Sequence, residues 1–280
     1  MAKVTVGVPV YNGVDLIGDS LDCLARQSFR DLEIIISDNA STDGTSDICA
    51  AFAARDGRFR HIRHETTSGP MENFLFVRDQ ATSPFFMWRA YDDLSDDRYV
   101  ETLLARLEAS PEAALAVATC HSKGGRKPGR TVGYRADDDG MRLLRIYRQI
   151  FFCHPGWFYG LWRTDACRRI TQSIYDAYPD PWASDRMAIF YAALADGVRG
   201  APEAEFVQRV TNDAPAYLTV SPKEMADQNR RFAAACRVGL QASALPAWEK
   251  LALRMLLPFY VNKRSHSLKR RIRAWKAQRR

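Results

Sequence analysis

The first 120 residues alternate two hydrophobic patterns, and this alternation limits the possible fold more than any other feature. Residues 3–10 (KVTVGVPV) and 32–37 (LEIIIS) are nearly continuous apolar and β-branched runs, typical of strands buried on both faces of a parallel sheet. Between them four apolar residues recur with the spacing of one helical face, at Val14, Ile17, Leu21 and Leu24. The order strand, helix, strand predicts an α/β fold.

The same alternation continues along the chain. It predicts helices over 43–55, over 71–80 and around Tyr99–Leu107, and strands over 59–64, 84–90 and 114–119. Repeated alternation of this kind predicts a doubly wound, mostly parallel sheet, whose ligands bind beyond the carboxyl ends of the strands. Functional residues are therefore expected directly after strands.

The remainder of the chain is less regular. Residues 121–139 are rich in Gly, Arg and Asp and predict a mobile loop that could act as a lid. Helices are expected over 141–151 and 183–195, with an aromatic segment at 154–163 (HPGWFYGLWR) between them. From residue 221 onward the pattern predicts a helical C-terminal extension without internal repeats.

The net charge of +7 comes from the C-terminal end of the chain. The last eighteen residues hold nine Lys or Arg and no acid, which leaves 31 basic and 33 acidic residues in the preceding 262. The body of the chain therefore gives no reason to expect a nucleic-acid-binding face.

Cysteine usage and hydropathy indicate the compartment. The six cysteines are scattered and form no C-x-x-C pair, and the N-terminal residues do not show a charged-then-apolar leader. Together these observations indicate a reducing, cytosolic environment. The longest apolar run, residues 251–261, is interrupted by Arg254 and Pro258, so we expect no membrane-spanning helix.

Two polar motifs follow the first two expected strands. In Val8–Gly13, Pro9 ends the strand, Gly13 permits a turn, and Tyr11 is presented at the mouth of the strand, although a merely structural turn explains the motif as well. In the run 37–45 (SDNASTDGT), one residue of Ser41–Asp43 could cap the next helix. Capping does not explain why Asp38 stands at the strand end.

Two further acidic motifs come later. Asp92 and Asp93 follow the apolar strand over 84–90, and two adjacent carboxylates at such a place are costly unless a cation neutralises them. A helix cap fits Ser95–Asp97 better. Asp185 stands in Trp182–Arg186 at the start of an expected helix, where a capping Ser followed by a helix-start acid is the alternative explanation.

These motifs, in this order and separation, resemble those of the family 2 glycosyltransferases of GT-A fold. The resemblance is close over residues 3–120 and looser over 150–212. It implies that Pro9 and Tyr11 lie against a nucleotide base, and that donor-binding contacts also come from four further residues: Asp38, Asn39, Asn73 and Asp92. It further implies that Asp93 binds Mg²⁺ or Mn²⁺, and that Asp185 is the catalytic base of an inverting enzyme.

The chain departs from the family pattern at two places. Ala90 stands where many relatives begin an Asp-x-Asp-Asp run, and the stretch 208–213 (QRVTND) stands where many relatives supply a late His. The resemblance therefore leaves the third metal ligand open, with Asp213 or water as substitutes.

The aromatic segment has two interpretations. Its residues suit a core strand, and they also suit an acceptor platform in which His154, Trp157 and Tyr159 contact a sugar. With the resemblance, the predicted domains are a catalytic domain over 1–215 and a helical extension over 216–280. Within the first, 1–120 would bind the nucleotide-sugar, 121–139 would form the loop, and 140–215 would bind the acceptor.

The resemblance favours an inverting transferase that moves a sugar from a nucleotide-diphospho-sugar, with UDP as carrier, to a glycan or lipid-linked acceptor in bacterial surface polysaccharide assembly. The alternatives are a noncatalytic nucleotide-sugar-binding or scaffold protein and a nucleotidyltransferase. The latter should carry a Gly-rich, basic loop where this chain has Tyr11–Gly13.

The basic tail adds a membrane hypothesis. Leu268, Ile272 and Trp275 share one helical face among Lys and Arg residues, the pattern of an interfacial helix, while a solvated C-terminus is the alternative. Residues 264–280 therefore predict contact with an anionic membrane surface, and a cytoplasmic enzyme held peripherally at the inner face of the plasma membrane.

Overall fold

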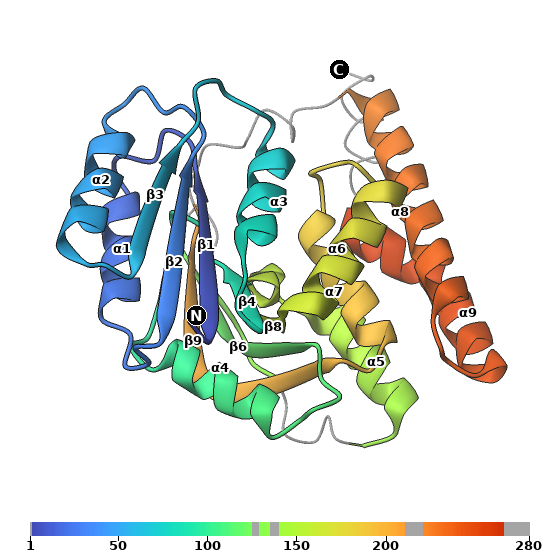
Figure 1. Ribbon diagram of the computed structural model, residues 1–280. Helices are drawn as coiled ribbons and strands as arrows, with labels where there is room; N and C mark the ends of the chain where they lie inside the picture. The colour runs from blue at the N-terminus through green and yellow to red at the C-terminus, as the bar shows by residue number, and fades with distance from the viewer. Residues whose placement is uncertain (1, 125–128, 135–139, 211–220, 266–280) are drawn as a thin grey trace. The chain divides into compact units, whose positions relative to one another are not determined.

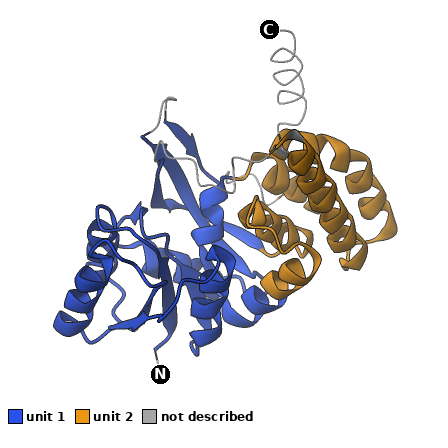
Figure 2. Cartoon of the chain, turned by 90° about the horizontal axis from the view of Figure 1, so that it is seen from above, with its two compact units in different colours: residues 1–136, 154–169, 198–212 blue, residues 137–153, 170–197, 213–280 orange. Residues whose placement is uncertain are grey.

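The computed structural model describes residues 2–124, 129–134, 140–210 and 221–265. They fall into two compact units (Figure 2). Unit 1 is formed by residues 1–136, 154–169 and 198–212, and unit 2 by 137–153, 170–197 and 213–280. This division cuts across the boundary at residue 215 that the sequence suggests, because two earlier segments pack with the helices that follow residue 221.

Unit 1 is built on one sheet whose first four strands are parallel. Strand β1 (Val4–Val10) lies between β2 (Leu32–Asp38) and β4 (Phe85–Trp88), and β3 (Phe59–Arg63) flanks β2. The carboxyl ends of these strands therefore meet at one edge of the sheet, as the alternating pattern predicts.

The other half of the sheet is mixed. The order is β3-β2-β1-β4-β8-β6-β9-β5. β8 (Leu161–Arg163) runs antiparallel between β4 and β6 (Leu115–Lys123). β9 (Val198–Arg209) runs parallel to β6 and antiparallel to the short β5 (Leu94–Ser95). Because β5 directly follows the two adjacent aspartates, β9 brings its carboxyl end close to them.

Helices cover both faces of the parallel half. α1 (Ile17–Ala25) and α2 (Thr45–Arg55) lie on one face and α3 (Pro70–Gln80) on the other (Figure 1). A Cβ atom on Gly7 of β1 would come within 2.7 Å of Val77 Cγ2, so this glycine lets α3 pack closely on the sheet. α4 (Tyr99–Glu108) packs on β6 and β9. The expected α/β fold with a helical C-terminal part is confirmed.

The predicted mobile loop over 121–139 is wrong where the structure describes it. β6 continues to Lys123 and pairs antiparallel with β7 (Arg130–Val132), and Tyr134 is buried. Thr131 supports this pairing because its hydroxyl lies 2.9 Å from His121 Nδ1. Residues 125–128 and 135–139 lie outside the described part.

The aromatic segment is only partly a strand. Pro155–Tyr159 forms a 3₁₀ helix, capped by the side chain of His154, and only Leu161–Arg163 joins the sheet as β8. Pro155 stands at the first helical position, and the Gly160 N–H donates to the Trp157 carbonyl. Both features favour a tight turn over an extended strand.

Unit 2 is helical. Its elements are α5 (Arg142–Phe152), the C-terminal part of α6 (Thr164–Ala177), α7 (Ser184–Leu194), α8 (Pro222–Ala242) and α9 (Ala247–Ser265). Aromatic rings fill its interior, where Tyr260 stacks on Phe190 with centroids 5.2 Å apart. No helix in the described ranges has the length and apolar character needed to cross a membrane.

Candidate active site

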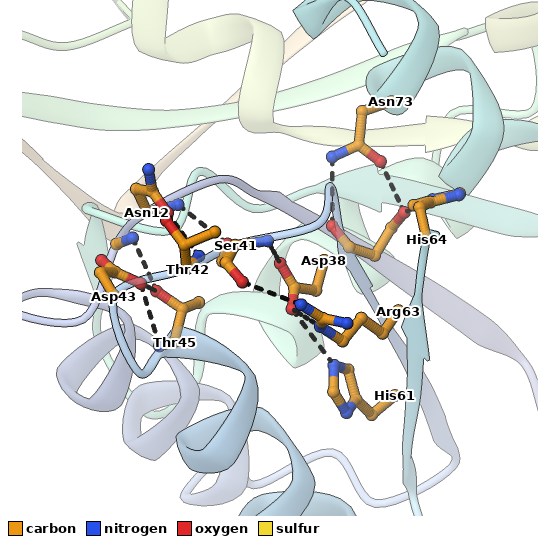
Figure 3. A network of polar contacts seen from close by, with 12 residues as sticks. Asn12, Asp38, Ser41, Thr42, Asp43, Thr45, His61, Arg63, His64 and Asn73 are labelled. Carbon is orange, nitrogen blue, oxygen red and sulfur yellow. Dashed lines mark hydrogen bonds and ion pairs between the residues drawn. The ribbon is translucent and has the colours of Figure 1, made fainter. Parts of the chain in front are cut away.

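The loops after β1 and β2 are joined by side chains that satisfy each other's backbone. Ser41 Oγ accepts from the Asn12 N–H at 2.9 Å, and Asn12 Oδ1 accepts from the Thr42 N–H at 2.9 Å (Figure 3). Asn12 takes the left-handed conformation in this turn, with φ of 48°. These bonds fix the start of the turn and leave Tyr11 47% exposed beside it.

Gly13 is needed for space. A Cβ atom there would lie 2.5 Å from the ring of Tyr91, the residue before the two adjacent aspartates. The Gly13 N–H donates to Thr45 Oγ1 at 2.8 Å, so the turn is also tied to the first residue of α2. The motif therefore links three strand ends.

Asp43 organises the start of α2 from outside the helix. Its carboxylate accepts from the backbone N–H groups of Val14 and Thr45 and from the Thr45 hydroxyl. Burial alone would raise the pKa of Asp43, but these hydrogen bonds outweigh it and lower the pKa. The N-cap position of α2 is Gly44, which has no side chain that could accept a hydrogen bond. Of the three residues proposed to cap this helix, only Asp43 does so, and it does so from the position before the N-cap.

Asp38 is a fully buried carboxylate at the end of β2. Oδ1 accepts from the Ser41 N–H at 2.9 Å, whereas Oδ2 accepts no hydrogen bond. Two nitrogen atoms lie within 4 Å of Oδ2, the cationic Arg63 Nε at 3.6 Å and His61 Nε2 at 3.9 Å. A buried acceptor without a donor is costly, and it suits an N–H group of a bound molecule.

His61 is held mainly neutral by its surroundings. Burial lowers the pKa of its imidazole, Asp38 opposes that shift, and Arg63 adds to it. The neighbouring His61 imidazole therefore does not neutralise the negative charge of Asp38.

Asn39 and Asn73 position loops. Asn39 Oδ1 accepts from the Ser68 N–H at 2.8 Å, and its Nδ2 donates to the Ser68 carbonyl. Asn73 Nδ2 donates to the Ser37 carbonyl at 3.1 Å, so Asn73 Oδ1 faces the Ser37 hydroxyl and accepts from it. Both asparagines are almost fully buried. Their side-chain amides form hydrogen bonds with other residues of the protein.

This arrangement also fixes a histidine tautomer. Because the Ser37 hydroxyl donates its hydrogen to Asn73, it accepts from His64 Nε2, 2.7 Å away. His64 therefore carries a proton on Nε2.

Pro9, opposite Ser37 in the β1–β2 register, is buried inside β1.

The adjacent aspartates are held by the end of β9. The backbone N–H of Arg209 donates to Asp93 Oδ1 at 2.9 Å, and its guanidinium donates to the Asp92 carbonyl and, at 2.9 Å, to the Leu16 carbonyl. A further contact of 2.8 Å reaches Asp19. No local sequence signal distinguishes Arg209, and sequence reasoning missed it.

Asp93 lies in an electrostatically unfavourable place for a carboxylate. Only 2% of it is exposed, and burial, followed by the charge of Asp92, raises its pKa to about 8. Burial also raises the pKa of Asp92. Arg89 is fully buried near them, with Nη2 2.6 Å from Ser95 Oγ, and opposes the shift of Asp93.

This pair fits a divalent cation. The buried Asp93 and the partly exposed Asp92 both have raised pKa values, so they gain from a nearby positive charge, and oxygen ligands suit Mg²⁺ and Mn²⁺. Within the described ranges no three His, Cys, Asp or Glu residues form a metal-binding cluster, so oxygens of a bound diphosphate or water would complete the shell. Asp213 lies outside the described residues.

His154 and Trp157 belong to the interior of unit 1. His154 Nδ1 accepts from the Gly156 N–H at 3.0 Å, Nε2 lies 2.8 Å from Ser122 Oγ, and the residue is 2% exposed. Trp157 is 3% exposed, and the half-buried Tyr159 stacks on Phe206 with centroids 5.6 Å apart. The geometry accounts for all three residues by packing.

Asp185 belongs to unit 2, in the first turn of α7. The residue is partly exposed, and Oδ1 accepts from the Arg186 N–H at 2.7 Å. Ser184 does not cap this helix, because its hydroxyl donates to the Pro181 carbonyl and the N-cap position is held by Ala183, with φ of 60°. Asp180, the other carboxylate nearby, is bound to the Trp182 N–H and to Arg231.

Comparison with known proteins identifies the family. The profile of Glycosyl transferase family 2 matches residues 5–167, more than half of the chain. The chain belongs to Glycosyl transferase family 2. A relative from Campylobacter jejuni, GalNAc(5)-diNAcBac-PP-undecaprenol beta-1,3-glucosyltransferase, is 32% identical over 94 residues, which are 33% of this chain and 30% of that protein. The matches make up only 17% and 35% of two other curated relatives' lengths.

Solved structures share the GT-A-like fold. Staphylococcus aureus TarS 1–349 in complex with UDP-GlcNAc aligns over 93% of this family 2 chain and 72% of its own, with a TM-score of 0.70 and 19% identity. The mannosyltransferase PcManGT of Pyrobaculum calidifontis, in complex with GDP-Man and Mn²⁺, aligns over 98% of this chain and 76% of its own, with a TM-score of 0.57 and 16% identity.

Proposed function

We propose that this chain is an inverting, metal-dependent glycosyltransferase that moves a sugar from a nucleotide-diphospho-sugar to a hydroxyl of a glycan or lipid-linked acceptor. The observation that carries the proposal is the fully buried Oδ2 of Asp38, which accepts no hydrogen bond, at the strand edge that also presents Tyr11. A flat base stacked on Tyr11 could donate a ring N–H to Asp38, as uracil and guanine can and adenine and cytosine cannot. Between these two we propose UDP as the carrier, because TarS, which aligns with the higher TM-score, was solved with UDP-GlcNAc.

Asn39 and Asn73 serve this site indirectly. Each holds a loop beside Asp38 through hydrogen bonds that use its own amide. We assign them a positioning role around the nucleoside and leave base contact to Pro9, Tyr11 and Asp38. Asp92 would face the ribose or the sugar.

Asp93, with Asp92, would hold Mg²⁺ or Mn²⁺ against the diphosphate. When bound, the cation stabilises the negative charge that develops on the departing diphosphate. The Arg209 N–H and the buried Arg89 keep the Asp93 carboxylate in place before the donor arrives.

Asp185 is proposed as the general base. It would take the proton from the acceptor hydroxyl while the hydroxyl oxygen attacks the anomeric carbon, and the bond to the diphosphate breaks on the opposite face. A single displacement of this kind inverts the anomeric configuration.

Bacterial surface polysaccharide or lipid-linked oligosaccharide assembly is the proposed setting, supported by the lipid-linked acceptor in the printed name of the Campylobacter relative. We place the protein in the cytoplasm, peripheral to the inner face of the plasma membrane, through residues 264–280. Leu268, Ile272 and Trp275 lie outside the described residues. Co-sedimentation with anionic liposomes, comparing the full chain with one ending at Asn262, tests this contact.

A panel of nucleotide-sugars with and without Mn²⁺, read by release of nucleoside diphosphate, tests the activity. Metal-dependent release that prefers one base is expected. A noncatalytic donor-binding protein is the second candidate, favoured by Ala90 and by the two-carboxylate metal site among the described residues. Donor binding without release of diphosphate would support that candidate.

A further inference from the structure

The outward face of α9 carries four large apolar side chains. They are 58% to 68% exposed, and we call them the outer stripe: Trp248, Leu251, Met255 and Phe259. Their spacing of three or four residues places them on one side of the helix. The other side is buried in unit 2 through Leu253, Leu257 and Tyr260.

A helix that is apolar on both sides normally has both sides covered. The inner side of α9 is covered by its own unit, whereas the described residues leave the outer stripe open. Single exposed apolar residues need no explanation, but four on successive turns indicate an interaction surface.

The exposed charges on α9 itself have one sign. The only acid of α9, Glu249, is 2% exposed, and Arg142 Nε lies 3.1 Å from each of its oxygens. Arg254 and Lys263 are exposed on the helix, and Lys250 is partly exposed. The sequence from 266 to 280 adds seven Lys or Arg and no acid.

We propose that the outer stripe is a docking face for an anionic lipid bilayer. Apolar and aromatic side chains flanked by basic residues suit the boundary between acyl chains and anionic headgroups. A second copy of the chain is a poorer occupant, because two such faces would bring like charges together. The inference goes beyond the proposed function, since it concerns α9 itself and requires no transfer chemistry.

Vesicle flotation of the full chain tests the docking face. The stripe variant replaces all four residues with Gln, which removes apolar area and keeps every charge. On phosphatidylcholine vesicles containing phosphatidylglycerol, we expect its partition coefficient to fall by at least about tenfold. The control Val238→Gln removes an exposed apolar residue of α8 and should stay within about twofold of wild type.

A single substitution tests the same face without risk to folding. Trp248 is the exposed tryptophan of the described chain, since Trp88, Trp157, Trp162 and Trp182 are at most 7% exposed. In a Trp275→Phe background, which removes the tail tryptophan, brominated lipids should quench the remaining fluorescence, and adding Trp248→Phe should remove most of that quenching. Quenching that survives Trp248→Phe and disappears with Trp275→Phe would assign the contact to the tail and overturn the proposal.

Two further outcomes would also overturn it. One is equal flotation of the stripe variant and wild type. The other is light scattering that shows a dimer removed by the stripe variant, together with no binding to anionic vesicles. Metal-dependent release of nucleoside diphosphate from a soluble donor should be unchanged in the stripe variant, so a failure of the proposed activity is distinguishable from a failure of this proposal.

Discussion

Arg209 and Asp93 are 116 residues apart, yet the backbone N–H of Arg209 donates to Asp93 Oδ1 at 2.9 Å. Any residue except proline at position 209 could supply that N–H. The guanidinium adds contacts that only arginine can make together, to the carbonyls of Asp92 and Leu16. The end of β9 thereby holds the acidic pair against the segment that leads into α1.

The first prediction concerns this guanidinium. Arg209→Met should remove a donor from two partly buried carbonyls, those of Asp92 and Leu16, and the free energy of unfolding should fall by about 1–3 kcal/mol. Mn²⁺-dependent UDP affinity should also fall, by roughly tenfold or more, since the aspartates lose their fixed position. Calorimetric titration and denaturant unfolding measure the two effects. Arg199→Met, in the same strand, is the control, because Arg199 pairs with Glu112; equal loss of UDP affinity in both variants would contradict a positioning role.

The second prediction separates function from stability at Asp93. Its pKa of about 8 lies above the ordinary value. The free energy of unfolding that Asp93 contributes therefore falls as pH rises from about 4 to about 8. Asn keeps the shape and can accept from Arg209, without the charge. Asp93→Asn should therefore leave the metal-free protein at least as stable at pH 7, and should abolish the Mn²⁺ dependence of UDP binding. Asp97→Asn, at an exposed carboxylate paired with Arg26, is the matched control.

Either of two results would argue against Asp93 as a metal ligand. Unchanged metal-dependent affinity in titration calorimetry is the first. The second is an equal loss in Asp97→Asn.

The third prediction tests the base. Asp185→Asn should keep donor binding near normal and lower sugar transfer by a factor of roughly 10² to 10⁴. Asp180→Asn should instead lower stability, because the Asp180 carboxylate already binds the Trp182 N–H and Arg231. Full transfer by Asp185→Asn would move the base to another residue.

The fourth prediction is a pH dependence. Burial lowers the pKa of His61 below its ordinary value of 6.5. The unfolded chain then binds the proton more readily, so the stability present above about pH 6.5 is lost as pH falls toward the folded pKa. The free energy of unfolding between pH 5 and 7.5 should slope less steeply in His61→Gln than in wild type. Arg60→Gln, on the same strand, should keep the wild-type slope; an unchanged slope in His61→Gln would contradict the assignment.

The sequence predicted the parallel half of the fold because each strand and helix there carries its own local pattern. The strand at Val4–Val10 is continuously apolar, and Ile17, Leu21 and Leu24 mark a helical face. The antiparallel β6–β7 pairing was missed, since the segment is polar and its register depends on tertiary contacts.

The candidate site was predictable to a similar extent. Asp38 and Asp93 stand directly after apolar strands, where a local pattern identifies them. Arg209 and the buried Arg89 act through residues distant in sequence, so only the sheet order reveals their roles. The burial of His154 and Asn73 follows from hydrogen bonds to Ser122 and Ser37, which no spacing rule indicates.

The last prediction compares two glycines five positions apart, Gly13 and Gly18. Gly13→Ala would place a Cβ 2.5 Å from the Tyr91 ring and 3.0 Å from Val10 Cγ2. Overpacking of this kind costs about 1–3 kcal/mol. Since Tyr91 precedes the acidic pair, UDP affinity in Mn²⁺ should fall as well.

Gly18→Ala is the matched control, because a Cβ there meets nothing within 4 Å and Gly18 lies in α1. Alanine at a helical position should raise the free energy of unfolding by about 0.5–1 kcal/mol and leave UDP affinity unchanged. Denaturant unfolding and calorimetry of both variants provide the comparison. If Gly13→Ala kept wild-type stability and affinity, the contact between the first turn and Tyr91 would have no part in shaping the site.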